Sequence, residues 1–264
     1  DNIANNNAYG LYLDFCDNNT ISDNIANNNS NGIHLSNSNG NLLSGNIVNN
    51  NTYGISLYKS NTNKLSVNTA NDNSHGIHLS NSNENMLSGN SANNNQYGIY
   101  LSHSDDNILS GNTASYNNNQ GIRLYYSDNN TLSGNTATIN NFRGLELFFG
   151  INNTLSGNIA SNNTDHGIYL YYSDNCTLIG NTASNNNYRG IGLSKSNYNK
   201  LSGNTISYNL NRGIGLSKSN YNTLSGNNIS NSHYGIYLYT SNNNTLLENT
   251  ANNNTYGIFL SKSN

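Results

Sequence analysis

The sequence predicts an all-β fold: a right-handed, single-stranded parallel β-helix solenoid of about 12 coils of 22–23 residues, with three short strands per coil. The first observation is a glycine that recurs every 22 or 23 residues along the whole chain. The second is an asparagine that follows eleven of these glycines after fourteen residues. Self-similarity at this period is typical of stacked coils. The recurring residues are Gly10, Gly32, Gly54, Gly76, Gly98, Gly121, Gly144, Gly167, Gly190, Gly213, Gly235 and Gly257, with Asn24, Asn46, Asn68, Asn90, Asn112, Asn135, Asn158, Asn181, Asn204, Asn227 and Asn249.

The first expected strand of each coil starts at the recurring glycine. There Gly-Ile-x-Leu alternates apolar and variable residues, as at 98–101 and 167–170, which indicates a short strand with one buried face. A second strand is expected around a repeated leucine and a third around a repeated small residue. No segment has the apolar spacing of a long helix, and parallel crossovers are overwhelmingly right-handed. The leucines include Leu43, Leu87, Leu132, Leu155, Leu201 and Leu224, and the small residues include Ala26, Ala70, Ala92, Ala137 and Ala183.

Asparagine columns are predicted to lie at the bends between strands. A carboxamide both donates and accepts, so it can bond to its copies in the coils above and below while it satisfies the bend. We therefore interpret these asparagines as structural. Cys176 and Ile151 interrupt such columns and should weaken their coils locally. The columns run through Asn24 and Asn249, through Asn7, Asn29, Asn95 and Asn140, and through Asn19, Asn63, Asn107 and Asn199.

The uninterrupted repeat predicts a single solenoid over residues 1–264. Neither end has an atypical capping coil, so we expect a piece of a longer protein whose exposed last coils could template end-to-end self-association. No apolar stretch is long enough to span a bilayer, and a net charge of −3 offers no basic field for nucleic acid. Cys16 and Cys176 lie seven coils apart, roughly 34 Å at the strand spacing, too far for a disulfide.

The repeat resembles the NosD-like, right-handed β-helix repeat family over essentially the whole chain. The motif that carries the resemblance is Asn-x-Leu-Ser-Gly-Asn-Thr-Ala, present at residues 107–114 and 130–137, followed by Gly-Ile-x-Leu. Coils this rich in asparagine resemble the repeat-bearing surface proteins of methanogenic archaea. The resemblance implies a range of functions: carbohydrate binding or cleavage, surface layers, and an accessory role in copper-enzyme maturation.

No catalytic residue emerges from the sequence. Pectate lyases and alginate epimerases of this fold pair a proline with arginine or acidic residues, and polygalacturonases use Arg-x-Lys with aspartates. The chain has no proline and no Arg-x-Lys. The serine column through Ser38, Ser60, Ser82, Ser104 and Ser127 recurs once per coil, which favours a structural role.

Metal ligands are equally sparse. Asp105, Asp106 and Asp128 are interpreted as turn residues, with a weak calcium site as the alternative, since aspartate replaces asparagine at bends for backbone reasons. Copper needs imidazole or sulfur ligands. His34 and His78 lie two coils apart, too far to share an ion, so the histidines are expected to face solvent without binding metal, and no cofactor is expected.

The pattern breaks in one place. The recurring asparagine and the next glycine are nine residues apart, instead of eight, in five consecutive coils that end at Gly121 through Gly213, which predicts a lateral bulge. The residue before the glycine changes there from mostly tyrosine to Arg143, His166, Arg189 and Arg212. Paired aromatics accompany the change. The resulting candidate carbohydrate-binding residues are Arg123, Tyr125, Tyr126, Glu146, Phe148, Tyr169, Tyr171 and Tyr172.

The alternative for this cluster is an aromatic ladder that stabilises the sheet, with Arg123, Glu146 and Arg143 as a surface ion-pair network. The regularity of the coils favours a non-enzymatic, structural or adhesive rod at an archaeal cell surface or outside the cell. Its expected partners are polysaccharides, other envelope components or further copies of the rod. The alternatives are a polysaccharide-acting lyase or hydrolase and a copper-maturation accessory protein of NosD type.

Overall fold

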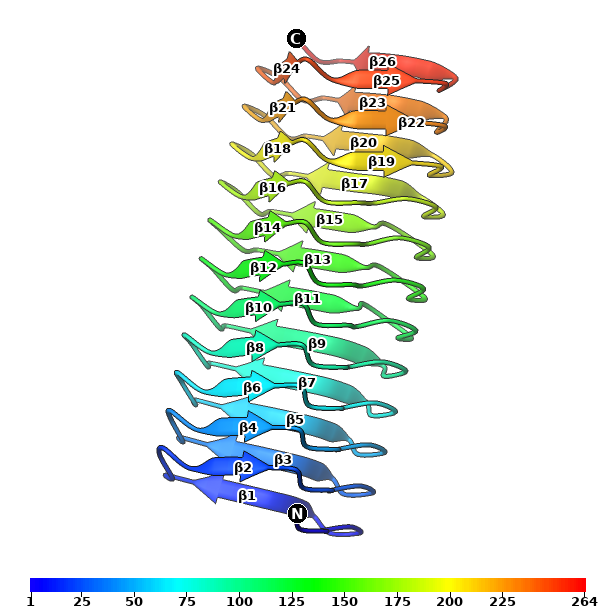
Figure 1. Cartoon of the computed structure of the whole chain (residues 1–264). Coiled ribbons are helices and arrows are strands. Elements are labelled where there is room, and N and C mark those ends of the chain that lie inside the picture. The colour runs from blue at the N-terminus through cyan, green and yellow to red at the C-terminus, as the bar shows by residue number, and fades with distance from the viewer.

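The computed structural model describes residues 1–264 as a rod of stacked coils, with the N-terminus at one end and the C-terminus at the other (Figure 1). Strands at equivalent positions of successive coils pair in parallel. The predicted right-handed parallel β-helix of about 12 coils is confirmed. The structure contains no helix that could cross a membrane.

The first side of the rod is a 12-stranded parallel sheet, because Gly-Ile-x-Leu pairs with its own copy in the next coil. Ile33 lies against Ile55 and Leu35 against Leu57, and this register keeps like residues in buried columns. Its strands are β1 (Tyr9–Asp14), β3 (Asn31–Ser36), β5 (Tyr53–Tyr58), β7 (His75–Ser80), β9 (Tyr97–Ser102), β11 (Ile122–Tyr125), β13 (Leu145–Phe148), β15 (Ile168–Tyr171), β17 (Arg189–Ser194), β20 (Arg212–Ser217), β23 (Tyr234–Tyr239) and β26 (Tyr256–Ser261).

The second side is an 11-stranded parallel sheet of three-residue strands, each centred on the inward position where leucine recurs. These residues pack against the isoleucine and leucine columns of the first side to form one continuous core. Its strands are β2 (Thr20–Ser22), β4 (Leu42–Ser44), β6 (Lys64–Ser66), β8 (Met86–Ser88), β10 (Ile108–Ser110), β12 (Thr131–Ser133), β14 (Thr154–Ser156), β16 (Thr177–Ile179), β18 (Lys200–Ser202), β21 (Thr223–Ser225) and β24 (Thr245–Leu247).

The third side is less regular than the sequence predicts. Only β19 (Thr205–Ser207), β22 (Asn228–Ser230) and β25 (Thr250–Asn252) form a sheet, and the earlier coils make one-residue parallel bridges there, such as Thr113 with Thr136. The residue after the bridge is in most of these coils an alanine buried in the core. Ile206 and Ile229 replace it in two of the three strands of the sheet, in keeping with the stronger β-propensity of branched side chains, and β25 keeps an alanine, Ala251.

The asparagine columns form hydrogen-bonded ladders at the bends, as predicted, and these ladders run through most of the coils. Asn135 donates its backbone N–H, at 2.9 Å, and its side-chain Nδ2, at 3.0 Å, to Oδ1 of Asn158 in the next coil. Asn158 in turn donates Nδ2 to the backbone oxygen of Leu132 at 2.9 Å. The serine column works similarly, since Ser82 donates its backbone N–H to the hydroxyl of Ser104 at 3.0 Å. The buried polar groups at the bends thereby find hydrogen-bond partners inside the stack.

Two ladders are interrupted next to each other, at Ile151 and Cys176. Asp128 accepts the backbone N–H of Ile151 at 2.7 Å, but Ile151 has no side-chain oxygen to accept from Asp174. The thiol of Cys176 stands where its neighbours Asn153 and Asn199 carry a carboxamide. Cys176 is buried and Cys16 is exposed, and both are free.

The five long coils differ from the others at the start of the first-side strand. In three of them the strand shortens from six residues to four, so that β11, β13 and β15 begin one residue after the recurring glycine. The additional residue is accommodated in the bend before that glycine, where Gly98 donates its backbone N–H to Gln120 at 3.2 Å. The predicted change of shape is therefore present at this bend and is strongest in the first three of the five long coils.

Candidate functional site

Two adjacent columns of aromatic rings run along the edge of the first sheet, where β11, β13 and β15 end. We call these six residues the double aromatic ladder. The inner column consists of the last residues of the three strands, and the outer column consists of the residues that follow them at the corner, with φ of 46°, 58° and 47°. The inner column is Tyr125, Phe148 and Tyr171, and the outer column is Tyr126, Phe149 and Tyr172.

The rings form a herringbone. Within the outer column the centroids are 4.7 Å and 5.1 Å apart and the planes nearly parallel, whereas inner and outer rings of one coil meet edge to face at 4.6–4.9 Å. These centroid separations exceed the ~3.5–4 Å of direct face contact, so successive rings are offset and part of each face stays uncovered. Tyr126 and Tyr172 are 42% and 40% exposed, so this edge faces solvent.

Three members of this surface were missing from the sequence-based set. Phe149 is the central ring of the outer column. His103 stacks on Tyr126 with centroids 5.3 Å apart, and Lys195 Nζ donates to the hydroxyl of Tyr172 at 2.7 Å. All three occupy the same corner position as Tyr126, at multiples of the 23-residue period, which is the signal that could have identified them.

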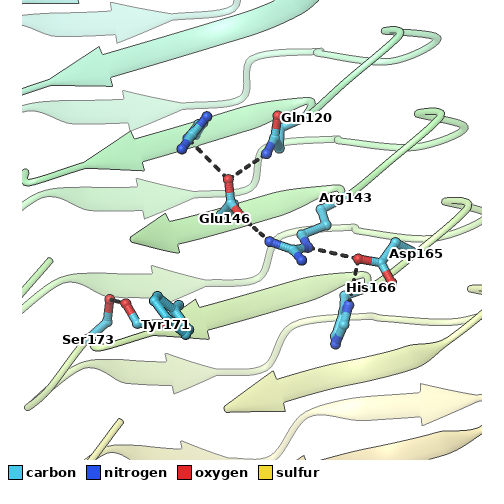
Figure 2. A network of polar contacts seen from close by, with 8 residues as sticks. Gln120, Arg143, Glu146, Asp165, His166, Tyr171 and Ser173 are labelled. Atoms are coloured by element: carbon cyan, nitrogen blue, oxygen red, sulfur yellow. Dashed lines mark hydrogen bonds and ion pairs between the residues drawn. The ribbon is translucent and has the colours of Figure 1, made fainter. Parts of the chain in front are cut away.

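A buried carboxylate, that of Glu146, lies beside the double aromatic ladder on β13 (Figure 2). Glu146 points outward from β13 but is only 2% exposed, because Gln120, Arg123 and Arg143 cover it. Arg123 Nε lies 3.1 Å from Glu146 Oε2, and Arg143 and Gln120 also donate to this carboxylate. The ion-pair network that the sequence predicted is therefore present, but its carboxylate is enclosed by the side chains around it. Glu146 is for this reason not accessible to a ligand.

The network continues to Asp165 and His166 (Figure 2). Arg143 Nε donates to Asp165 Oδ2 at 2.8 Å, and His166 Nδ1 lies 3.0 Å from the same oxygen. His166 is 4% exposed, so the expectation that the histidines face solvent is wrong for this residue. The reason is that the residue before the recurring glycine folds across the sheet onto the next coil, as Arg143 does onto Tyr169 at 4.1 Å.

Burial and the contacts between neighbouring side chains set the charges of His166 and Asp165. Desolvation lowers the pKa of His166 to about 4, although Asp165 acts in the opposite direction. Burial raises the pKa of Asp165, but the contacts with His166 and Arg143 outweigh it and bring the pKa to about 2. At neutral pH His166 is therefore uncharged and Asp165 ionised.

A hollow of about 310 Å³ opens next to His166 on the same face. Tyr169 connects it to the ladder, since its ring lies 6.4 Å from that of Tyr171. Gly192 and Gly215 replace the larger outward residues of the preceding and following coils, and this leaves room for the side chains of His166 and Arg189 to lie across the sheet beside the hollow. The hollow is lined by Arg143, Asp165, His166, Tyr169, Tyr188, Arg189, Ser194 and Ser217.

The other sequence-based candidates have structural roles. Asp105 accepts the backbone N–H of Asp128 at 2.7 Å, and Asp128 accepts that of Ile151. Asp106 lies at a bend with φ of 59°. These are the expected turn contacts, and no group of three or more His, Cys, Asp or Glu side chains in the chain could hold a metal ion.

The N-terminal histidines form a separate stack. His75 lies between Tyr53 and Tyr97, with centroids 4.8 Å and 5.0 Å away, and His78 stacks on Tyr100. Burial and the neighbouring His75 lower the pKa of His78 to about 4. His34, His75 and His78 are half-buried, so the stacking of rings accounts for them better than free exposure to solvent.

The largest hollow, about 880 Å³, lies at the bend before β7, β9 and β11. It is lined entirely by polar residues, from Asn50 to the bulge residues Asn118 and Asn119, and carries one carboxylate, Asp72. No aromatic ring lines it. The face with the ladder and the smaller hollow therefore combines more of the groups that recognise a ligand.

Acid is expected to destabilise the protein through its buried neutral histidines. An unfolded histidine takes up a proton near pH 6.5, but folded His166 does so only near pH 4. Stability is therefore complete above pH 6.5 and falls between pH 6.5 and 4, by on the order of 2–3 kcal/mol for this residue. Thermal melts of the wild type and His166→Gln over this range measure the effect.

The substitution should reduce the slope of melting temperature against pH, whatever its effect at pH 7.5, where the wild-type ring is neutral in both states. His78→Gln should reduce the slope independently. Identical slopes in the wild type and His166→Gln would contradict the proposed neutral state of the buried ring.

Comparison with protein families gives one matching model, described as periplasmic copper-binding protein (NosD). It matches residues 1–120, 81–150, 102–223 and 209–264, which overlap and together span the chain. No curated protein matches the sequence.

Several solved structures share the architecture. The periplasmic alginate epimerase AlgG is 17% identical with a TM-score of 0.73, over 91% of this chain and 72% of that protein. The A-module of mannuronan C-5 epimerase AlgE4 from Azotobacter vinelandii is 14% identical with a TM-score of 0.59, over 92% and 87%. Pectate lyase Pel9A is 15% identical with a TM-score of 0.58, over 81% and 68%. At these identities the likeness is one of fold.

Proposed function

Because this chain belongs to the NosD family, we propose that it is a β-helical rod located outside the cytoplasm, a structural or adhesive element whose lateral face binds polysaccharide. The location is supported by the description of the family as periplasmic and by the description of AlgG, which shares the fold, as a periplasmic protein. A cell-surface position and an archaeal source remain part of this proposal, motivated by the asparagine-rich repeat.

The observation that carries the binding role is the double aromatic ladder. Single exposed apolar side chains occur in most coils, but here six large rings gather at one edge, where Tyr126 and Tyr172 face solvent. Sugars contact aromatic rings through their C–H faces, and tyrosine also offers a hydroxyl to a hydroxylated ligand. Because the rings partly cover one another, a ligand would meet the uncovered faces, the ring edges and the hydroxyls of Tyr126 and Tyr172.

The state of the carboxylates supports a non-enzymatic role. Glycoside hydrolysis uses two carboxyl groups that can reach the substrate. On this face Glu146 is enclosed by two arginines, and Asp165 is held by Arg143 and His166. Asp105 and Asp128 bond to backbone N–H groups of the next coil.

Copper, which the family description names, does not fit the residues of this chain. Copper centres use several imidazole, thiolate or thioether ligands around one ion. The nearest histidines, His75 and His78, have ring centroids 5.5 Å apart and are stacked among tyrosines, with no third ligand group beside them. Burial raises the pKa of Cys176 to about 12, which disfavours the thiolate that a metal needs. We therefore derive no function through copper.

Binding to a panel of neutral, uronate-containing and sulfated polysaccharides tests the proposal. Replacing Tyr126 and Tyr172 together with alanine should weaken binding about tenfold or more, in the range of exposed tyrosine anchors. The matched control is Tyr198→Ala with Tyr221→Ala, because these rings also stack, at 5.1 Å, and are 55% and 51% exposed on a different corner.

Affinity gels or calorimetry provide the measurement. The control pair should bind as the wild type does. Absence of binding to every polymer would overturn the proposed role, and so would an equal loss in both pairs of variants.

A further inference from the structure

Two arginines on the same face lack an acidic partner. Arg189 and Arg212 occupy equivalent positions at the start of β17 and β20 and pair directly in register. Neither forms an ion pair with Asp or Glu, whereas Arg123 and Arg143 are paired with Glu146 and Asp165. The one hydrogen bond from these two guanidinium groups goes from Arg189 Nη2 to the hydroxyl of Tyr188, at 3.2 Å.

Arg189 is also removed from water, and Arg212 is half-buried. Arg189 is 8% exposed, and the Nε atoms of both residues are buried without a hydrogen-bond partner. Burial and the like charge of Arg189 lower the pKa of Arg212. An unpaired buried charge is costly unless an opposite charge or hydrogen-bond acceptors compensate it. Aromatic rings supply part of that compensation, since the Arg189 guanidinium lies 4.8 Å from the ring centroid of Tyr188 and that of Arg212 lies 3.8 Å from the ring centroid of Tyr237. No acidic residue of this chain pairs with either arginine, so an anionic ligand from outside would complete it.

The space around the pair is built by two glycines. A Cβ atom on Gly215 would lie 3.0 Å from Cδ of both Arg189 and Arg212. A Cβ atom on Gly192 would lie 2.5 Å from Cδ2 of His166. In the coils before and after these two, the residue equivalent to Gly192 and Gly215 is a tyrosine, Tyr169 or Tyr237. Two consecutive glycines therefore occur only where the arginine side chains lie flat across the sheet.

Further polar groups point to a ligand in the same hollow. His166 is nearly fully buried, and its Nε2 has no partner on the side that faces Gly192. Ser194 and Ser217, at the ends of β17 and β20, line the hollow with Tyr188. The guanidinium group of Arg189 and these hydroxyls line the hollow, and the one carboxylate there, Asp165, is already paired with Arg143 and His166. Together they form a site for an oxyanion, which a guanidinium group binds in bidentate fashion.

We propose that Arg189, with Arg212 in the next coil adding positive charge, forms a subsite for the acidic group of a polysaccharide, either the carboxylate of a uronate or a sulfate ester. The polysaccharide part of this inference rests on the proposed function, since Tyr169 and Tyr171 connect the hollow to the double aromatic ladder. The anion part rests on the unpaired arginines alone. A polymer along the ladder would place an acidic substituent against Arg189 about one coil beyond Tyr171.

The first experiment uses small anions and does not depend on polymer binding. Thermal melts of the wild type, Arg189→Gln and Lys200→Gln are compared in sodium sulfate and in sodium glucuronate, at constant ionic strength. Lys200 is the matched control, because it is an exposed positive charge in the same region on the second sheet. One of the two anions should raise the melting temperature of the wild type and of Lys200→Gln more than that of Arg189→Gln.

Comparison between variants is needed because sulfate stabilises folded proteins generally. The anion that gives the difference identifies the preferred group. Without added anion, Arg189→Gln should melt at or above the wild type, since it removes a repulsive buried charge. A purely structural arginine would instead lower the melting temperature when replaced.

The second experiment measures binding to a polyuronate, a sulfated polymer and a neutral polymer. Arg189→Gln should weaken binding of the preferred acidic polymer roughly ten- to hundredfold and leave the neutral polymer unchanged. Arg189→Lys keeps the charge but loses the planar fork and should have an intermediate effect. Replacement of Tyr126 and Tyr172 should weaken binding of both kinds of polymer.

The outcomes separate the two proposals. If no polymer binds but the small-anion shift is lost in Arg189→Gln, the polysaccharide function fails and the anion site stands. If polymers bind through the ladder while Arg189→Gln responds to both anions as the wild type does, the anion site is overturned and the ladder function stands. An equal loss in Lys200→Gln would also overturn the site, because net charge alone would explain it.

Discussion

Alanine in place of Gly121 is expected to destabilise the stack of coils strongly. A Cβ atom there would lie 2.6 Å from the backbone oxygen of Ala114 and 2.9 Å from the Cβ of Ala137. Both neighbours are held by the backbone hydrogen bonds of the stack, so neither can move aside alone. Overpacking of a core usually costs 1–3 kcal/mol, and contact with fixed backbone should raise the cost to at least about 3 kcal/mol.

The control for this variant is Gly134→Ala. Gly134 has φ of +61°, and a Cβ atom there would meet nothing within 4 Å. Asp23, Val67 and Glu248 occupy this column in other coils with φ of 54–55°, so a side chain costs only the roughly 1 kcal/mol of a left-handed backbone. Soluble yield and thermal melts followed by circular dichroism provide the comparison. Melting of Gly121→Ala within about 2 °C of the Gly134→Ala variant would contradict the steric explanation.

Removal of one ladder asparagine is expected to have a similarly large effect. Asn158 is fully buried, and its side chain takes part in hydrogen bonds to Asn135, Leu132 and Asn181. Asn158→Ala removes the acceptor of both the backbone N–H and the side-chain Nδ2 of Asn135, and it removes one donor from the backbone oxygen of Leu132. Each such group costs about 1–3 kcal/mol, so the total should be about 3–5 kcal/mol.

The matched control is Asn187→Ala, because Asn187 is exposed and its side chain makes no hydrogen bond in the structure. It should change stability by less than about 0.5 kcal/mol. Urea or thermal unfolding of the two variants, in the same buffer as the wild type, gives the comparison. Equal destabilisation by Asn158→Ala and Asn187→Ala would show that the buried ladder does not carry the stability assigned to it.

The glycine columns show how far sequence alone reaches. Both columns, the one with Gly121 and the one with Gly134, are visible as repeats in the sequence. The repeat period does not show that glycine is required in the first column by close backbone contact and is only favoured in the second by a positive φ. That distinction depends on where a missing Cβ atom would lie relative to the next coil, and so on the three-dimensional stack.

The candidate site divides in the same way. Tyr125, Tyr126, Phe148, Tyr171 and Tyr172 were recognisable from their positions in the repeat, and the structure places them in one ladder. Glu146 and His166 were expected at the surface, but side chains from neighbouring coils cover them. The hollow at Gly192 and the unpaired arginines were not predicted, because each depends on a side chain that folds across the sheet onto a residue 26 positions later.

The sequence by itself determined the coil, the parallel register, the buried columns and the asparagine ladders. These features follow from local alternation repeated at a fixed period, so each coil specifies the position of the next. Only the tertiary structure decided which outward side chains are covered, which charges find partners and where space remains. Those properties arise from the sizes and directions of side chains in adjacent coils, which the period brings together but does not itself describe.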